Sequence, residues 1–234
     1  MVNSDHAIGI KIPSIRKSSG MALVSANADA FCSYGLKESF VASICLECSE
    51  RSHNALNELI RNPDTSLQVG ELVYCFWTRE PTEFNAVRSV DNPDPDDVKR
   101  LLETVTQGGP PLQSQANDFY AVALSANSAR VVVRSYLETT LSEVQRNLAQ
   151  WFRWQQLYAG DTPVGVFQLA RALYFKADDI PAHVPETLIR CAITGAPLPM
   201  SLLQLAIQRN RAEQGVTDNR ARLIQAVLHS HNQL

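Results

Sequence analysis

The 234-residue sequence lacks any run of eighteen apolar residues, so it predicts no membrane-spanning helix. Its N-terminal region also lacks the continuous apolar stretch that a signal peptide carries. Cysteine is sparse, and the five cysteines are an odd number that does not favour a framework of disulfides. Together these absences predict a cytoplasmic protein with reduced thiols.

An excess of positive charge is also absent, because 21 lysines and arginines face 24 acidic residues and the net charge is −3. The chain as a whole is therefore not a basic nucleic-acid binder. The charge is uneven, however. Residues 62–118 hold ten acids and four bases, whereas residues 119–234 hold eleven bases and eight acids. If nucleic acid is bound, the C-terminal half is the better candidate.

The common catalytic motifs are missing. The sequence has no HExxH, no GxxxxGK followed by Ser or Thr, no GxSxG and no GxGxxG. Catalytic triads can assemble from scattered residues, so a catalytic site of another kind stays open. We expect a protein that is not an enzyme and that needs no cofactor.

Metal-ligand patterns are incomplete. Cys45 and Cys48 form a Cys-x-x-Cys pair near His53, but a structural zinc ion takes four ligands and usually a second close pair. Both cysteines also fit the apolar stripe of a helix predicted over residues 40–60, so we interpret them as core residues. The acidic segment 91–97 lacks the calcium-loop pattern and is predicted to be a solvated loop. The sequence therefore predicts no metal site.

What the sequence does contain is a hairpin signal over residues 119–136, where two apolar runs flank a short polar turn. Side chains alternate between the faces of a strand, so Arg130, Val132, Arg134 and Tyr136 share one face. Two guanidiniums beside an aromatic ring suit phosphate and base contacts. A solvated strand face without a specific partner fits the same residues.

The remaining patterns predict an α+β fold, with a small, mainly antiparallel sheet followed by a helical region. Strands are predicted near residues 22–27, 70–77, 118–125 and 130–137. A loop is predicted over residues 79–97. Helices are predicted over 40–60, 98–106, 163–175, 185–193 and 202–207, with another after residue 140 and a last one capped by Thr217 or Asp218. Residues 1–139 and 140–234 are predicted as the two domains.

Aromatic and basic residues in the C-terminal half have two interpretations each. Trp151 and Trp154 are expected in the core or in a subunit contact, rather than under bases. Four arginines crowd the last two predicted helices, and such clusters bind nucleic-acid phosphates: Arg209, Arg211, Arg220 and Arg222. A surface helix pair with ordinary charges is the alternative.

Several segments resemble, in the same order, the large subunit of the type I-C CRISPR effector complex, Cascade, in the Csd family. They are SSG at 18–20, LVSAN at 23–27, AFCSYG at 30–35, FW at 76–77, LSANSAR at 124–130, VR at 133–134, LIRCAITGAPLP at 188–199, LL at 202–203, RNRAE at 209–213 and NRA at 219–221. The family's chains are longer at both ends, so this chain corresponds to their central portion.

The resemblance implies a non-catalytic subunit of an RNA-guided antiviral surveillance complex that helps to hold guide RNA and target DNA. Base pairing reads the sequence in such complexes, while protein supplies charge, shape and partner contacts. The implied partners are the backbone and handle-binding subunits, CRISPR RNA, target DNA and a recruited helicase–nuclease. The expected nucleic-acid contacts are Lys17, Asn27, Tyr34, Arg130, Arg134, Arg190, Arg209 and Arg211.

A different class of function remains open. The chain could be a helical protein-interaction module or a small-molecule enzyme that kept only the fold. A pocket lined by Asn27, Tyr34 and Arg130 would be the signature of the enzyme.

Overall fold

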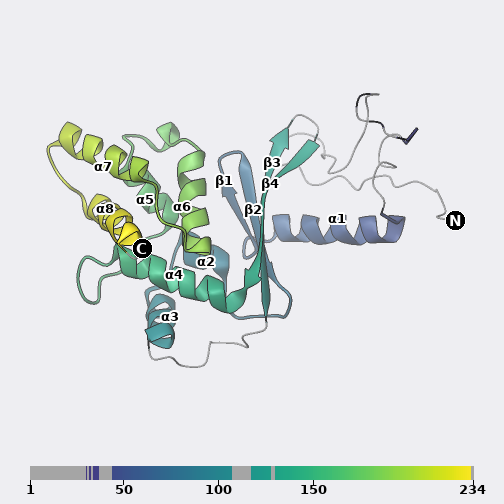
Figure 1. The fold of residues 1–234 in the computed structure, drawn as a ribbon, viewed down its shortest axis with the longest axis horizontal. Coiled ribbons are helices and arrows are strands. Elements are labelled where there is room, and N and C mark those ends of the chain that lie inside the picture. Colours follow the sequence, from purple (N-terminus) through teal and green to yellow (C-terminus); the bar gives the residue numbers. More distant parts are fainter. Residues whose placement is uncertain are drawn as a thin grey trace. The chain divides into compact units, whose positions relative to one another are not determined.

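The structure is a computed structural model that describes residues 44–106, 117–127 and 130–232, with isolated positions between 30 and 36. It has an α+β fold with an antiparallel sheet, as the sequence predicts (Figure 1). The elements are α1 Leu46–Arg61, β1 Ser66–Val69, β2 Leu72–Thr78, α2 Ala86–Asp91, α3 Pro95–Thr106, β3 Asp118–Asn127, β4 Arg130–Thr140, α4 Leu141–Gln155, α5 Val166–Ala172, a 3-10 turn Ala177–Asp179, α6 His183–Thr194, α7 Met200–Glu213 and α8 Asp218–His231.

Most of the predicted elements are confirmed, including three strands and the helical region after residue 140. The predicted strand near residues 22–27 lies outside the described residues. Two short elements, β1 and α2, were not predicted, and α2 occupies part of the segment 79–97 that was expected to be a loop. The helix α5 is shorter than its predicted range of 163–175.

The chain forms two compact units, residues 1–77 with 121–137 and residues 78–120 with 138–234. The strands β3 and β4 therefore each contribute residues to both units. The described strands lie in the order β1-β2-β3-β4 within one sheet. The linear domain division at residue 139 stays a prediction.

In the first unit, α1 packs against the sheet. The core consists of Val73, Cys75, Val122, Leu124 and Val131, and the α1 side chains packed on it are Leu56, Leu59 and Ile60. Their spacing of three and four residues places them on one helix face. The hydroxyls of Thr65 and Ser66 donate to the carbonyls of Leu59 and Ile60 at 2.8 and 2.9 Å, which satisfies the end of α1 and joins it to β1.

The hairpin of β1 and β2 has a two-residue turn, because its register pairs Val69 with Leu72. Gly70, in that turn, has φ +56°. Two-residue hairpin turns require positive φ, which glycine adopts without a steric penalty. This turn explains why the segment is two strands rather than the single predicted one.

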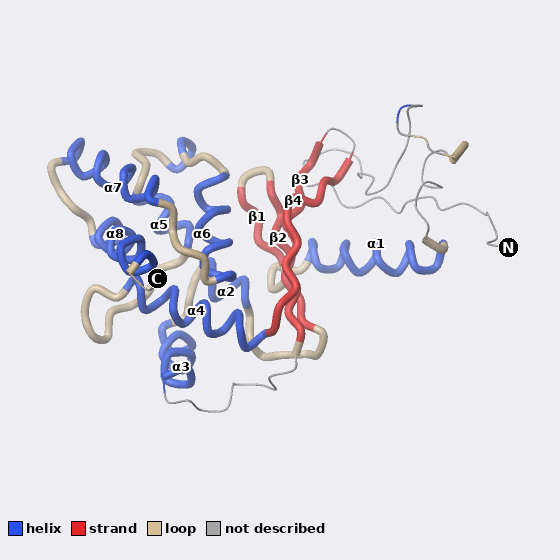
Figure 2. The backbone as a smooth tube through the Cα atoms, in the orientation of Figure 1, coloured by secondary structure: helices blue, strands red, loops and turns tan. Residues whose placement is uncertain are grey.

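In the second unit, the other helices gather around α4 (Figure 2), which packs against α3, α6 and α8. Trp151, Phe152 and Trp154 are almost fully buried, so the predicted core position of both tryptophans is confirmed. Asn117 fixes the entry to β3, since its side chain accepts from the Glu80 N–H at 2.8 Å and donates to the Glu80 carbonyl at 2.9 Å. Among the described residues, no helix is long and apolar enough to cross a bilayer.

Gly165, at the N-terminus of α5, approaches the backbone of α2 closely. A Cβ on Gly165 would lie 1.7 Å from the Asp91 carbonyl oxygen, a distance that only a backbone shift relieves. Gly165→Ala should therefore destabilise the second unit by about 1–3 kcal/mol and lower the melting temperature by several degrees. Gly215→Ala is the matched control, because the nearest atom to its new Cβ is 3.8 Å away. Equal melting temperatures for both variants would contradict this close approach.

Candidate nucleic-acid interface

The hairpin of β3 and β4 carries the first predicted nucleic-acid contacts. Arg134 has an exposed side chain on β4, and its Nε donates to the Ser125 hydroxyl at 2.7 Å. Ser125 is buried on β3, so the hydrogen bond fixes one edge of the guanidinium. The two terminal nitrogens of Arg134 have no partner among the described residues, which leaves them open to a phosphate.

Burial along β4 follows the predicted alternation only at its start. Val131 is buried in the core, whereas Val133, on the same face, is 51% exposed. Tyr136, on the Arg134 face, is also exposed. β4 is the last strand in the described order, and its side chains from Val133 to Tyr136 are exposed. The structure does not describe the side chain of Arg130. Its position beside Arg134 therefore stays a prediction from strand geometry.

The other predicted contacts are dispersed. Arg190 on α6 and Arg211 on α7 have exposed side chains without an ion pair to any residue that the structure describes. Tyr34 is fully exposed and has φ +54°. Lys17 and Asn27 lie outside the described residues.

Arg209 is held inside the second unit. Its Nη2 lies 2.6 Å from Glu213 Oε1, and its Cζ lies 3.1 Å from the centroid of the Phe175 ring. Arg220 pairs with the other oxygen of the same carboxylate and is 2% exposed. One carboxylate therefore links two arginines of α7 and α8. A nucleic-acid contact by Arg209 stays a prediction and would compete with this arrangement.

Arg222, on α8, forms a bidentate ion pair with Asp161, in the loop after α4, with Nη2 2.6 Å from Oδ1. Both side chains are buried. Burial alone would raise the pKa of Asp161. The hydrogen bonds and charge of Arg222, with the Leu157 and Thr162 N–H groups, outweigh this effect and lower the pKa below its ordinary value. Of the four arginines predicted as a cluster, Arg211 alone is exposed.

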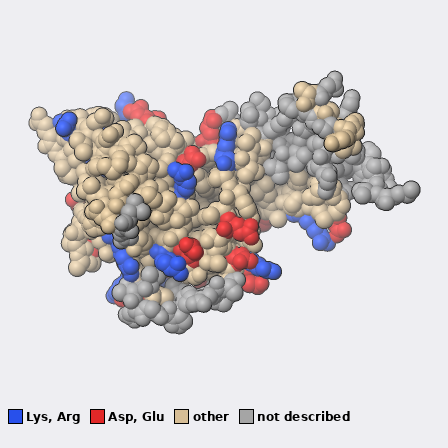
Figure 3. All heavy atoms as spheres, viewed as in Figure 1, with Lys and Arg blue, Asp and Glu red and all other residues tan. Residues whose placement is uncertain are grey.

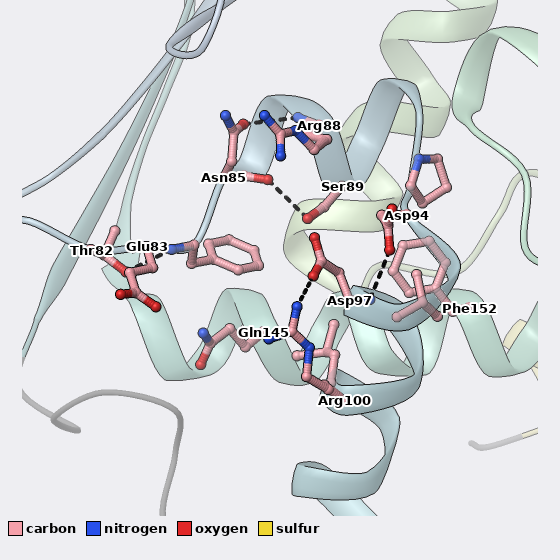
Figure 4. Close-up of a pocket in the computed structure, with 14 residues that line it drawn as sticks. Thr82, Glu83, Asn85, Arg88, Ser89, Asp94, Asp97, Arg100, Gln145 and Phe152 are labelled. Atoms are coloured by element: carbon pink, nitrogen blue, oxygen red, sulfur yellow. Dashed lines mark hydrogen bonds and ion pairs between the residues drawn. The ribbon is translucent and has the colours of Figure 1, made fainter.

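A cavity of about 200 Å³ lies within the second unit, lined by residues of α2, α3 and α4 and by the segments that precede α2 and α3. Figure 4 shows both carboxylates and guanidiniums around it. Asp94 accepts from the N–H groups of Asp96 and Asp97 at 2.9 and 3.2 Å and so caps α3. Asp97 in turn pairs with Arg100. Most polar groups here already have structural partners.

The same cavity is also lined by Gln145 of α4, whose side chain is 4% exposed. The opposing charges of Arg88 and Arg100 and of Glu83 and Asp94 give the cavity no clear preference for a charged ligand. It contains none of the three residues that would mark the small-molecule alternative.

The prediction that Cys45 and Cys48 are core residues is wrong. Cys45 and Cys48 are both exposed at the start of α1, whereas the apolar α1 side chains packed on the sheet core are Leu56, Leu59 and Ile60. The segment 91–97 is also not a simple loop, since it contains the end of α2 and the start of α3. In the described residues, no group of three or more His, Cys, Asp or Glu side chains could hold a metal ion.

Sequence analysis found Arg134, Arg190 and Arg211 but missed the partners of the other arginines. Glu213 lies four residues after Arg209, a spacing that allows an ion pair on a helix. The sequence therefore contained a signal for the ion pair between Arg209 and Glu213. Asp161 and Arg222 are 61 positions apart, and no local pattern connects them. Gln145 was likewise not predicted to line a cavity.

Comparison with known proteins gives one family match. The model of the family described as "CRISPR-associated protein (Cas_Csd1)" matches residues 3–234. No curated protein matches the chain.

Removal of the buried carboxylate should be costly. Asp161→Asn keeps the shape of the side chain but leaves the Arg222 guanidinium buried without a counter-charge. We expect the free energy of unfolding in urea at pH 7 to fall by about 3–5 kcal/mol. The control is Asp97→Asn, which breaks the exposed pair with Arg100 and should change stability by less than about 1 kcal/mol. Similar losses in the two variants would show that the Asp161 pair is not buried in solution.

The same pair predicts a sign for the acid dependence of stability. Because the pKa of Asp161 is lower in the folded chain, its contribution is complete above the unfolded carboxyl pKa of about 3.9. The contribution is lost as pH falls through the folded value. Urea titrations from neutral to acid pH should therefore show a steeper loss below about pH 4 in the wild type than in Asp161→Asn. Parallel curves would contradict the lowered pKa.

Proposed function

Because the chain belongs to the Csd1 family of CRISPR-associated proteins, we propose that it serves as a non-catalytic part of the large subunit of the type I-C Cascade complex. In this role it helps to hold guide RNA and target DNA and to assemble the complex in the cytoplasm. The observation that carries the proposal is the family match, which extends over residues 3–234.

The charge distribution supports a subunit with a limited number of nucleic-acid contacts. Figure 3 shows Lys and Arg dispersed among Asp and Glu on the face drawn, rather than in one broad basic area. A guide–target duplex is recognised by base pairing, and the protein needs only to neutralise selected phosphates and match the shape of the duplex. Exposed arginines without an ion pair to any described residue, such as Arg134, Arg190 and Arg211, suit that task.

The proposal assigns the chain no chemistry of its own. Its partners are the backbone and handle-binding subunits, CRISPR RNA and target DNA, and a separate helicase–nuclease is recruited to cut the target. The absence of catalytic motifs from the sequence supports this division of labour. The fully exposed Tyr34 does not favour the small-molecule alternative, in which it would line a pocket.

Salt dependence distinguishes phosphate contacts from structural arginines. In the assembled complex, Arg190→Ala and Arg211→Ala should each weaken DNA and RNA binding regardless of sequence. Each should also reduce the slope of log K against log salt by roughly 0.7–0.9. The double variant Arg130→Ala, Arg134→Ala should reduce the slope by about twice as much. Affinity would be measured at several salt concentrations.

Two further variants control this experiment. Arg171→Ala removes an exposed arginine outside the family-like segments and should leave both affinity and slope unchanged. Arg209→Ala loses the contacts with Glu213 and Phe175, so it should lower the melting temperature. Unchanged slopes in every variant, with intact melting temperatures, would contradict the proposed phosphate contacts.

A further inference from the structure

The first turn of α1 brings two exposed thiols together. Cys45 is the N-cap of the helix, and its Sγ accepts a hydrogen bond from the backbone N–H of Cys48 at 3.3 Å. Figure 1 shows this end of α1 on the side away from the strands of its unit. Neither side chain packs in the core, so both are open to small reagents.

The two thiols differ in acidity because of this contact. The pKa of Cys45 is lowered, first by a hydrogen bond from the Cys48 thiol and then by the Cys48 N–H, although burial and the nearby Glu47 oppose the shift. The pKa of Cys48 is raised, mainly because its thiol is the donor to Cys45. Arg51 pairs with Glu47 at 2.6 Å and partly offsets that carboxylate. Since the thiolate is the nucleophilic form, Cys45 is the more reactive of the two.

The spacing also permits a disulfide. Cys-x-x-Cys at the start of a helix is the spacing of thiol–disulfide oxidoreductases, in which the two cysteines form a disulfide. A disulfide takes Cβ atoms about 3.5–4.5 Å apart, and Cys45, as the N-cap with extended backbone, lies outside the regular helix whose i,i+3 separation is wider. Cys75 and Cys191 differ, since both are buried, and burial raises the pKa of the Cys75 thiol to about 12.

We propose that Cys45 and Cys48 are a thiol–disulfide exchange pair whose substrate is an exposed organic disulfide, with Cys45 as the attacking thiol and Cys48 as the resolving thiol. The Cys45 thiolate attacks one sulfur of the organic disulfide, whose S–S bond breaks and releases one thiolate. Cys48 then loses its proton and attacks Cys45 Sγ, which releases the second thiolate. The pair is oxidised to one disulfide, while the organic disulfide is reduced to two thiols.

The test uses the full chain, oxidised glutathione as the probe and mass spectrometry as the readout. In the wild type, the mass should fall by two hydrogen atoms, and peptide mapping should find the bond between Cys45 and Cys48. Cys48→Ser should instead retain one glutathionyl group on Cys45, because the resolving thiol is gone. Cys45→Ser should acquire its group on Cys48 several-fold more slowly at neutral pH.

Two controls keep the result interpretable. Cys32→Ser should still form the Cys45–Cys48 disulfide at the wild-type rate. Circular dichroism should show wild-type helix content in Cys45→Ser and Cys48→Ser, since both of these side chains are exposed. Stable glutathionyl groups on both cysteines of the wild type would overturn the proposal, because ring closure would not be occurring. Equal reaction rates of Cys45 and Cys48 in the single variants would overturn the assignment of the attacking thiol.

Discussion

The second unit depends on the burial of α4 by the helices around it. Along α4 the buried side chains recur so densely that three neighbouring helices are needed to cover them. Trp151 and Phe152 alone remove two large aromatic side chains from water, each worth about 2–3 kcal/mol on burial. The loops and charges of this unit are arranged to allow that packing.

Near the end of α4, the polar side chains of Asp161 and Arg222 are buried beside this apolar core. Asp161 accepts from the Leu157 N–H at 3.0 Å as well as pairing with Arg222. The Gln156 carbonyl accepts from Gln225 on α8 at 2.5 Å. The loop after α4 is therefore joined to α8 by the buried pair of Arg222 and Asp161 and by the partly buried hydrogen bond from Gln225 to Gln156. Specific partners are needed here, because a buried charge without one is strongly destabilising.

This use of arginine changes how the positive half of the chain is understood. The excess of bases after residue 119 includes Arg209, Arg220 and Arg222, which neutralise acids within the unit. Formal charge counted along the sequence therefore overstates the positive surface that a nucleic acid can meet. Within the described part of this half, arginines such as Arg134, Arg190 and Arg211 stay exposed, which suits the proposed contacts to selected phosphates within an assembly.

Sequence patterns predicted elements with strong local signals. The hairpin of β3 and β4, the apolar face of α4 and the end of α6 at Gly195, with φ +70°, all have such signals. Short elements such as α2 have too few residues to show a period. Burial of Cys45 and Cys48 was wrongly predicted, because periodicity identifies a helix face but not how far the neighbouring sheet extends. The pair of Asp161 and Arg222 depends on tertiary packing that no local pattern encodes.

The most direct test of the central claim is to isolate the tagged chain from cells that carry a type I-C CRISPR locus and to sequence the RNA that remains bound. The account predicts strong enrichment of CRISPR RNA, together with other subunits of the complex. A chain with a scrambled sequence and the same tag would set the background. Background levels of CRISPR RNA, from a chain that is folded and expressed, would contradict the assignment to the guide-bearing complex.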